Sequence, residues 1–441
     1  MAAYSNPPAS GVEAAPEAKL PEREEDNVES NKASIMPYPQ DVFGDEEHAE
    51  VRYKVLTWWP CAILMVAETI SLGVLALPAA IGNLGLVPAL CILLGLGAVA
   101  TYTDYVIGQL KWKYPHISSA ADAGQLIMGR FGRELLFWSN MMYLVFIMAS
   151  HLLTFTVAMN TITKHATCSI VFGVVGLIVS FLLAIPRTLE RMTWLSFISF
   201  TSIIATVLIT MIAVGIRNTP PPITTLFLHN TFFTIISELR EPRDFPKSLA
   251  LLQSVHMTIY VVAAVVIYCY TGRDVPSPAL GAAGPLISRI SYGIALPTII
   301  IAGVIMGHIA CKSIYVRVFA GTDRMHKRDV VAVGSWLAIA FGVRVVAWII
   351  ASSIPVFNSL LSFIVSLFAS WFSFGLPGIF WLWMNKGQWF ASPRKIGLTF
   401  LNVFCICIEI ILCGLGLYAS GKAIHDDPQS ASFSCANNAD Y

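Results

Sequence analysis

The stretch WWPCAILMVAETISLGVLALP, residues 58–78, decides the fold class. It is apolar over about 20 residues, the length that a helix needs to cross roughly 30 Å of hydrocarbon. It nevertheless places Glu68, two hydroxyl side chains, Gly73 and Pro78 at bilayer depth. Gly73 relaxes the backbone, and Pro78 lacks an N–H and crowds the carbonyl four residues before it. We expect a membrane-spanning helix that breaks near residues 71–74; the alternative is a simple proline kink whose hydroxyls bond back to the preceding turn.

Further apolar runs of spanning length follow this stretch. We expect about eleven transmembrane helices in an all-α integral membrane protein, and the sixth is the weakest prediction. The expected spans are 56–81, 84–109, 134–163, 168–186, 193–216, 224–239, 249–271, 286–316, 329–353, 355–384 and 396–419.

The composition excludes other classes of protein. The 441 residues are 56% hydrophobic and only 12% charged, and the net charge of +1 gives no field that would attract nucleic acid. No phosphate-binding loop, complete dinucleotide fingerprint or nucleophile elbow is present, so we expect no enzyme. The nine cysteines lack CxxC spacing, so we expect no metal site and mostly packing roles.

The ends of the chain and the loops indicate the orientation. Residues 1–50 hold 12 of the 27 acids and no apolar period, which predicts a disordered tail. Alternating the loops places nineteen Lys and Arg on one side against four on the other, so the amino terminus is cytosolic and the carboxyl terminus is outside. Cys168 and Cys435 both lie outside in this topology and could form a disulfide.

Several ionisable residues lie within the expected spans. An ionisable group inside a span costs a few kcal/mol and usually faces a cavity, a partner or an ion path, so we expect a function for Glu68. Asp104 and Glu409 lie nearer to span ends, where we expect each to reach the interface or pair with a neighbouring helix. For Arg344 we expect snorkelling or pairing with a carboxylate rather than substrate contact.

Buried histidines and glycines are further candidates. His151, His229 and His308 could line a pathway, although a lone histidine in a membrane more often packs through a hydrogen bond. Gly303 and Gly307 have the spacing of close helix packing, and the same glycine face would leave room for a ligand.

Four ordered motifs carry a family resemblance. The motifs are 58–78, ATYTDYVIGQLKWKYP (100–115), ISELREPRDFP (236–246) and AGVIMGHIACKSIYVRVF (302–319). Together they resemble fungal neutral amino acid permeases of the amino acid/auxin permease family, over about residues 52–421. The resemblance implies a LeuT-like fold, with two inverted five-helix repeats plus one helix and a substrate at midplane. Its domains would be a cytosolic tail (1–50), a transporter domain (51–421) and a polar extracytosolic tail (422–441).

The resemblance also implies site residues. The amides of the first-helix break would receive the substrate carboxylate, with sixth-helix contacts from His229, Phe232 and Phe233. Gly303, on the glycine face that would leave room for a ligand, is a further expected substrate contact that does not depend on the resemblance. Glu68, for which helix pairing is the alternative, and the buried His308 are the candidates for ion coupling. The residues of the break are Thr69, Ser71, Leu72, Gly73 and Val74.

One region departs from the family pattern. Residues 223–238 offer only 16 residues, about 24 Å of helix, where a full broken helix is expected. The outer half of the sixth helix is missing, so either coding sequence is skipped or the chain is a divergent or impaired carrier. A short sixth span could still cross by thinning the bilayer.

The leading functional prediction is a secondary active transporter of neutral amino acids, aliphatic or aromatic. We expect proton symport by alternating access, with sodium as the other coupling ion and no cofactor. The alternative is an amino acid receptor or sensor that does not transport, and a channel is disfavoured because no ring of filter residues is visible. The expected partners are the amino acid and the lipid bilayer, with the plasma membrane favoured over the vacuole; the sequence leaves the oligomeric state open.

Overall fold

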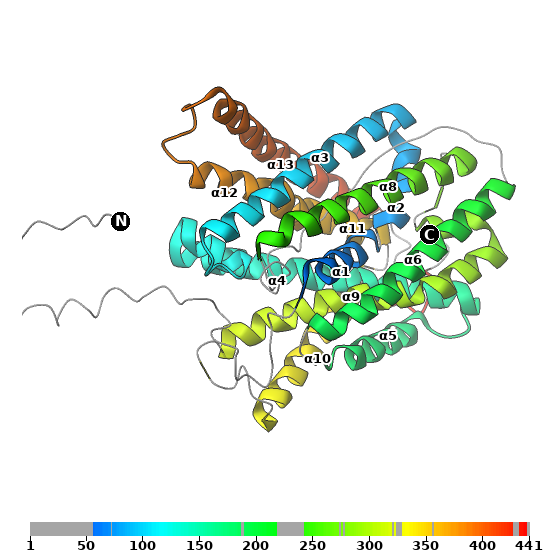
Figure 1. Ribbon diagram of the computed structural model, residues 1–441. Coiled ribbons are helices and arrows are strands. Elements are labelled where there is room, and N and C mark those ends of the chain that lie inside the picture. The colour runs from blue at the N-terminus through cyan, green and yellow to red at the C-terminus, as the bar shows by residue number, and fades with distance from the viewer. Residues whose placement is uncertain are drawn as a thin grey trace, which may run out of the picture. The chain divides into compact units, whose positions relative to one another are not determined.

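The computed structural model describes ten parts of the chain, and every structural statement below refers to these residues. Within them the chain is almost entirely helical (Figure 1). The described residues are 56–71, 73–186, 189–217, 242–272, 275–276, 278–319, 322, 329–354, 357–426 and 432–438.

The helices match ten of the eleven expected spans, and the sixth, 224–239, lies outside the described residues. In the described part, eight helices are long and apolar enough to cross a membrane, or nine if α1 and α2 form one bent span. The all-α membrane fold class is therefore confirmed. The helices are α1 (Trp58–Ile70), α2 (Gly73–Leu84), α3 (Leu86–Lys113), α4 (Ala120–Thr163), α5 (Ser169–Leu183), α6 (Leu189–Arg217), α8 (Phe245–Thr271), α9 (Pro285–Phe319), α10 (Val330–Ser353), α11 (Phe357–Ile364), α12 (Leu376–Met384) and α13 (Pro393–Asp426), with short 3-10 turns η1 (Pro242–Asp244) and η2 (Ala279–Ala283).

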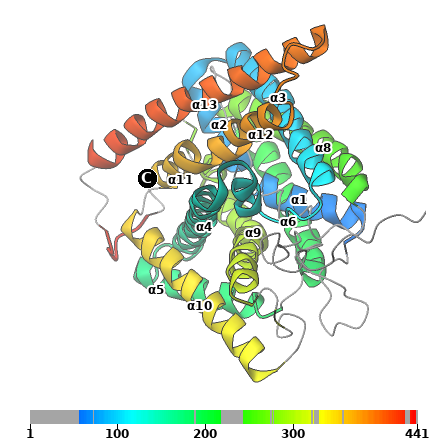
Figure 2. The ribbon, with the colours of Figure 1, turned by 90° about the vertical axis from the view of Figure 1, so that its left-hand side faces the viewer.

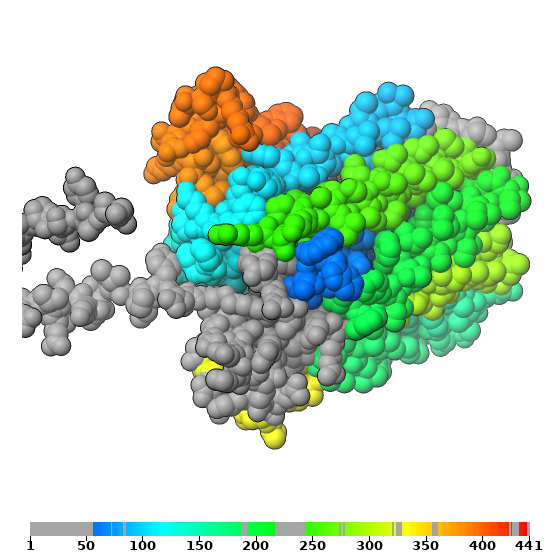
Figure 3. Space-filling view, viewed as in Figure 1, coloured from blue at the N-terminus to red at the C-terminus, as the bar shows by residue number. Residues whose placement is uncertain are grey.

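Two long helices form the centre of the bundle. In α4 and α9, 78% of the most apolar window is buried inside the protein, against 22% in α3 and α13. α4 and α9 pack against each other, and Figure 2 shows them surrounded by the other helices. On one face, α8 lies between α3 and α1 (Figure 3). A helix buried on all sides keeps apolar residues around its circumference, whereas the outer helices present theirs to lipid.

Three interruptions divide the helices. α1 and α2 meet at 41° across a break at residues 71–72, where the sequence predicts one. α4 begins at Ala120, earlier than the expected 134, because Ser119 and Asp122 form a capping box, and it kinks at Gly129 (φ 65°). The expected span 355–384 contains two π-helical stretches, Val365–Ala369 and Trp371–Gly375, between α11 and α12.

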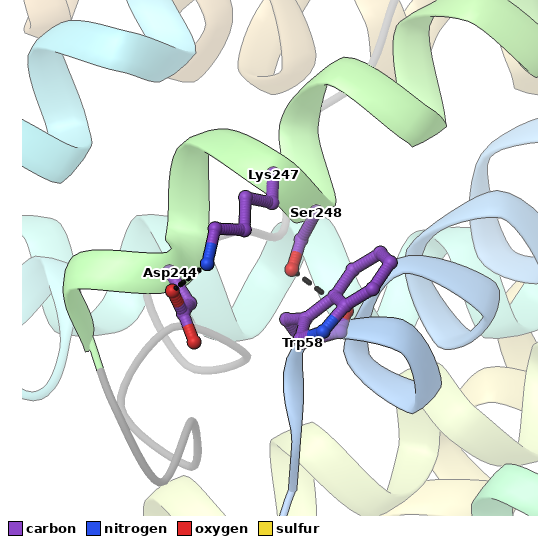
Figure 4. A network of polar contacts seen from close by, with 4 residues as sticks. All are labelled: Trp58, Asp244, Lys247 and Ser248. Carbon is purple, nitrogen blue, oxygen red and sulfur yellow. Dashed lines mark hydrogen bonds and ion pairs between the residues drawn. The ribbon is translucent and has the colours of Figure 1, made fainter.

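α6 and α8 run in the same direction. The ring of Phe197, early in α6, lies 5.8 Å from that of Trp59 at the start of α1. Ser248, early in α8, donates to the Trp58 carbonyl at 2.8 Å (Figure 4). At the other end, a Cβ on Gly215 of α6 would lie 3.8 Å from the Tyr270 ring of α8. The end of α6 and the beginning of α8 therefore lie on opposite faces of the bundle.

The expected disulfide is confirmed, since Cys168 is bonded to Cys435. The residues around Cys435 also bind the ends of three helices. Ser169 Oγ of α5 donates to the Ala436 carbonyl at 2.5 Å, Asn160 Nδ2 of α4 donates to Asn438 Oδ1 at 2.7 Å, and the Phe433 N–H donates to the Ser352 carbonyl of α10 at 2.8 Å. We call residues 432–438 the tail strap; it fastens α4, α5 and α10 at one face.

Candidate functional site

The break between α1 and α2 is the first part of the candidate site. α1 ends at Ile70, Ser71 leaves the helical conformation (φ −36°, ψ −88°), and α2 begins at Gly73. A break frees backbone N–H and C=O groups that a continuous helix would pair, and the start of α2 points its own free N–H groups into this region. The break therefore places unpaired backbone polar groups inside the helical bundle.

The side chains at the break are buried. Glu68 is 4% exposed, Thr69 is 2% exposed and Ser71 is 1% exposed. The Ser71 hydroxyl has no hydrogen-bond partner among the residues that the structure describes. Val74 is buried as well, whereas the expected contact Leu72 lies outside the described residues. The break thus combines an acid, hydroxyls and freed backbone in a place that lipid does not reach.

Tyr260 of α8 occupies the break. Its hydroxyl donates to the Thr69 carbonyl at 2.8 Å, so it satisfies one of the groups that the break frees. A Cβ on Gly73 would lie 2.1 Å from the same hydroxyl, which explains why the first residue of α2 has no side chain. The His256 ring packs against the Tyr260 ring with centroids 4.0 Å apart. Sequence reasoning missed Tyr260, because nothing in the apolar run around it distinguishes this tyrosine from a packing residue.

His151 and Gly303, predicted separately, lie together between α4 and α9. A Cβ on Gly303 would lie 2.8 Å from the His151 Cβ, and His151 Nδ1 lies 2.9 Å from the Ile299 carbonyl. Both residues border a small cavity of about 20 Å³ between α4, α5 and α9. The lining residues come from these three helices and none comes from α1, so the cavity and the break are separate features. The lining residues are Met148, His151, Leu152, Phe155, Gly176, Ser180, Ile299, Ile300 and Gly303.

His308 lies in the contact between α9 and α10. It is fully buried, and its ring lies 5.1 Å from that of Trp336. Arg344 is also fully buried there; Nη1 donates to the Ala340 carbonyl at 2.9 Å, and a Cβ on Gly307 would lie 2.9 Å from Nη2. The expectation for Arg344 is wrong for the described part of the chain, because its guanidinium neither reaches the surface nor pairs with a described carboxylate. Because Gly307 has no side chain, the Arg344 guanidinium can pack against α9 inside the bundle.

Asp104 and Glu409, the two other intramembrane acids, each form a hydrogen bond with a neighbouring helical segment. Of the two expectations for these acids, pairing with a neighbouring helix is therefore the one that the structure supports. Asp104 of α3 accepts a hydrogen bond from Gln253 Nε2 of α8 at 3.3 Å. Glu409 of α13 accepts one from Ser370 Oγ at 2.8 Å, beside the π-helical stretches. The expected sixth-helix contacts His229, Phe232 and Phe233 lie outside the described residues.

Comparisons with known proteins agree with this architecture. The sequence matches the family described as "Transmembrane amino acid transporter protein" over residues 54–226 and 223–421. It is 34% identical to the N amino acid transport system protein of Neurospora crassa, over 91% of this chain and 97% of that one. It is 26% identical to a transmembrane transporter of Gibberella moniliformis (89% and 90% covered) and 24% identical to one of Fusarium pseudograminearum (89% of each).

The comparisons also bear on the short sixth span. The family match divides into two pieces that meet at residues 223–226, inside the region that departs from the pattern. The alignment with the Neurospora protein has 456 positions, more than the 441 residues of this chain, so that protein has positions without a counterpart here. The rest of the match covers the break, α4 and α9. A chain with this helical core and this similarity over most of its length is a transporter and no enzyme, and it belongs to the transmembrane amino acid transporter family.

Proposed function

We propose that the protein is a secondary active transporter that moves neutral amino acids across a membrane together with protons, by alternating access. The observation that carries the proposal is the buried break between α1 and α2, with Thr69 and Ser71 beside freed backbone groups. The name of the Neurospora relative, an amino acid transport system protein, supports an amino acid as the substrate.

The chemistry of the break suits the two charged groups of an amino acid. A substrate carboxylate would accept hydrogen bonds from the N–H groups at the start of α2, Gly73 and Val74, where the helix dipole favours a negative charge. The ammonium group would face the carbonyl end of α1 and the hydroxyls of Thr69 and Ser71. A neutral side chain suits the apolar surroundings of the break, such as Ile70 and Leu75, which are 0% and 2% exposed.

The coupling ion needs a group that binds it inside the membrane. Glu68 lies one residue before Thr69 and is almost fully buried, so it is our first candidate for the proton-binding acid at the break. His308, in the contact of α9 with α10, is the second candidate. Gly303, with His151 against it, would contribute on the α9 side, and His229, Phe232 and Phe233 stay predictions for the sixth span.

Uptake by whole cells tests the proposal. The full chain would be expressed in yeast that lacks its own permeases, and uptake of labelled phenylalanine and leucine would be measured at acidic and neutral pH, with and without sodium. We expect accumulation above the external concentration that is stimulated by acid and indifferent to sodium. Surface abundance, measured by labelling from outside, is the control for expression.

Two results would contradict the proposal. If sodium rather than acid stimulated uptake, the coupling ion would be sodium and not the proton. Substrate binding without uptake, by a chain that reaches the surface, would favour the receptor. The observation in favour of this alternative is that the family match divides at residues 223–226.

A further inference from the structure

A second buried acid lies on α3, which packs against α8 as α1 does. Asp104 is 4% exposed, and its Oδ2 accepts a hydrogen bond from Gln253 Nε2 at 3.3 Å. α8 lies between α3, which carries Asp104, and α1, which carries the break (Figure 3). Neither the resemblance nor the break assigns a function to this pair.

The amide of Gln253 has an unused acceptor. Its Oε1 atom is buried and has no hydrogen-bond partner within the described ranges. A buried acceptor without a donor has an energetic cost, and a buried carboxylate without a cation has a larger one. One added proton removes both costs: protonated Asp104 would donate its O–H to Gln253 Oε1 while Gln253 Nε2 still donates to Asp104. A carboxylic acid and a primary amide then form a closed pair with two hydrogen bonds.

A row of polar side chains on α8 joins this pair to the break. Gln253, His256 and Tyr260 are spaced i, i+3 and i+7, which places them on one face of the helix. His256 packs on Tyr260, and the Tyr260 hydroxyl bonds the Thr69 carbonyl. Gln253 lies one turn before His256 on this face, so the row leads from the pair to α1.

We propose that Asp104 and Gln253 form a proton-binding pair on the cytosolic side of the break. The proton that is carried with the substrate would occupy this pair. This inference rests on the proposed proton symport. On binding, a proton from water or from the row forms an O–H bond at Asp104 Oδ1; on release the same bond breaks and the proton returns to water. No electrons are exchanged, and one proton is gained and lost in each cycle. The pair lies toward the end of α3 and the beginning of α8, the face that we propose to be cytosolic.

The elements packed against α8 bring few other charges to this row. α1 contributes Glu68 and Cys61, and α2 and the described side chains of α6 contribute none. Further along α3, the Lys111 ammonium donates to the Pro115 and Ile117 carbonyls at 2.8 and 2.6 Å. The remaining groups on η1, α3 and α8 are Arg243, Asp244, Lys247, Tyr102, Tyr105, Lys113, Cys91, Tyr268, Cys269 and Tyr270.

Infrared spectroscopy of the purified full chain tests the pair directly. We expect a C=O stretching band of a protonated carboxyl group that weakens as the pH rises and is lost in Asp104→Asn. Gln253→Leu, which removes the acceptor, should shift this band. Glu409→Gln is the matched control, because Glu409 is another buried acid with one hydrogen bond, and it should leave the Asp104 band in place. A wild-type spectrum without any band that Asp104→Asn removes, at every pH, would overturn the proposal.

Transport by the same variants tests the coupling role. The amide of Asp104→Asn can form the same two hydrogen bonds to Gln253 that protonated Asp104 would form, so we expect the variant to fold and to exchange substrate across the membrane. It should lose acid-driven accumulation, about tenfold for a gradient of one pH unit. Acid-driven accumulation by Asp104→Asn would contradict the coupling role. Wild-type uptake without acid stimulation would overturn the symport and this role with it, whereas the infrared band decides the proton site by itself.

Discussion

At the scale of single residues, the contact between Gly73 and Tyr260 makes the sharpest prediction. Gly73→Ala should lower both uptake and the apparent Tm, because the new methyl group would lie 2.1 Å from the Tyr260 hydroxyl. Overpacking of this kind costs about 1–3 kcal/mol. Gly95→Ala on α3 is the control, since a Cβ there meets no atom within 4 Å. Thermal unfolding in detergent and uptake at equal surface abundance measure the two effects.

The double variant Gly73→Ala/Tyr260→Phe tests whether Gly73→Ala acts through the clash with the Tyr260 hydroxyl or through a loss of backbone freedom at residue 73. Tyr260→Phe removes the hydroxyl and with it the hydrogen bond to Thr69, which should cost about 0.5–1.5 kcal/mol alone. Added to Gly73→Ala, it should restore part of the lost Tm, because the nearest ring atom, Cζ, then lies 3.1 Å from the methyl group instead of an oxygen at 2.1 Å. Additive losses in the double variant would show that the two residues do not interact.

Glu68 makes a prediction about coupling. Glu68→Gln should reduce the acid stimulation of uptake while surface abundance stays unchanged, because the amide keeps the shape of the side chain and cannot take up a proton. Uptake as a function of external pH measures this. Retained pH dependence would exclude Glu68 as the coupling acid and would leave Asp104 as the next acid to consider.

The sequence predicts this site only in part, and the reason is sequence separation. Gly73 and Pro78 are local signals, so the break could be placed within a few residues. Tyr260 lies 191 residues from its partner Thr69, and no local pattern shows which tyrosine of a later span reaches back. The same holds for the pairing of Asp104 with Gln253, which lie 149 residues apart.

At the scale of elements, hydrophobic runs predict the helices better than their ends. The cores of ten spans agree with the structure because bilayer thickness imposes their length. The early start of α4 and the extension of α13 to Asp426 were outside the prediction, because polar helical turns beyond the bilayer carry no hydropathy signal. The π-helical stretches were missed as well, since an extra residue in a turn leaves the composition unchanged.

The tail strap makes a prediction for the elements that it joins. Cys435→Ser should lower the apparent Tm under non-reducing conditions, because the strap no longer fastens α4, α5 and α10 covalently. A reducing agent should lower the Tm of the wild type and leave the variant unchanged. Cys91→Ser is the control, since Cys91 is a free, exposed cysteine. An equal Tm for Cys435→Ser and the wild type would mean that the noncovalent contacts of the strap suffice.

At the scale of the whole molecule, two independent observations bear on the number of crossings. α6 and α8 run in the same direction, so the chain leaves α6 on one face and enters α8 on the other. The disulfide joins the loop before α5 to the chain after α13, which requires an even number of crossings between them. With the sixth span that the sequence predicts, the number of crossings would be eight, which agrees with both observations. Lys and Arg in the loops favour the same count.

Labelling of single cysteines tests this topology and its orientation. We expect Lys164→Cys and Ile216→Cys to react with a membrane-impermeant thiol reagent on intact cells, because both lie at ends that we place outside. Lys247→Cys and Lys386→Cys should react only after the cells are opened. Lys164 is the control, since it precedes α6 and its placement does not depend on a crossing between α6 and α8. Equal reactivity of Ile216→Cys and Lys247→Cys on intact cells would contradict that crossing, and inverted reactivity of all four positions would reverse the orientation while keeping the crossing.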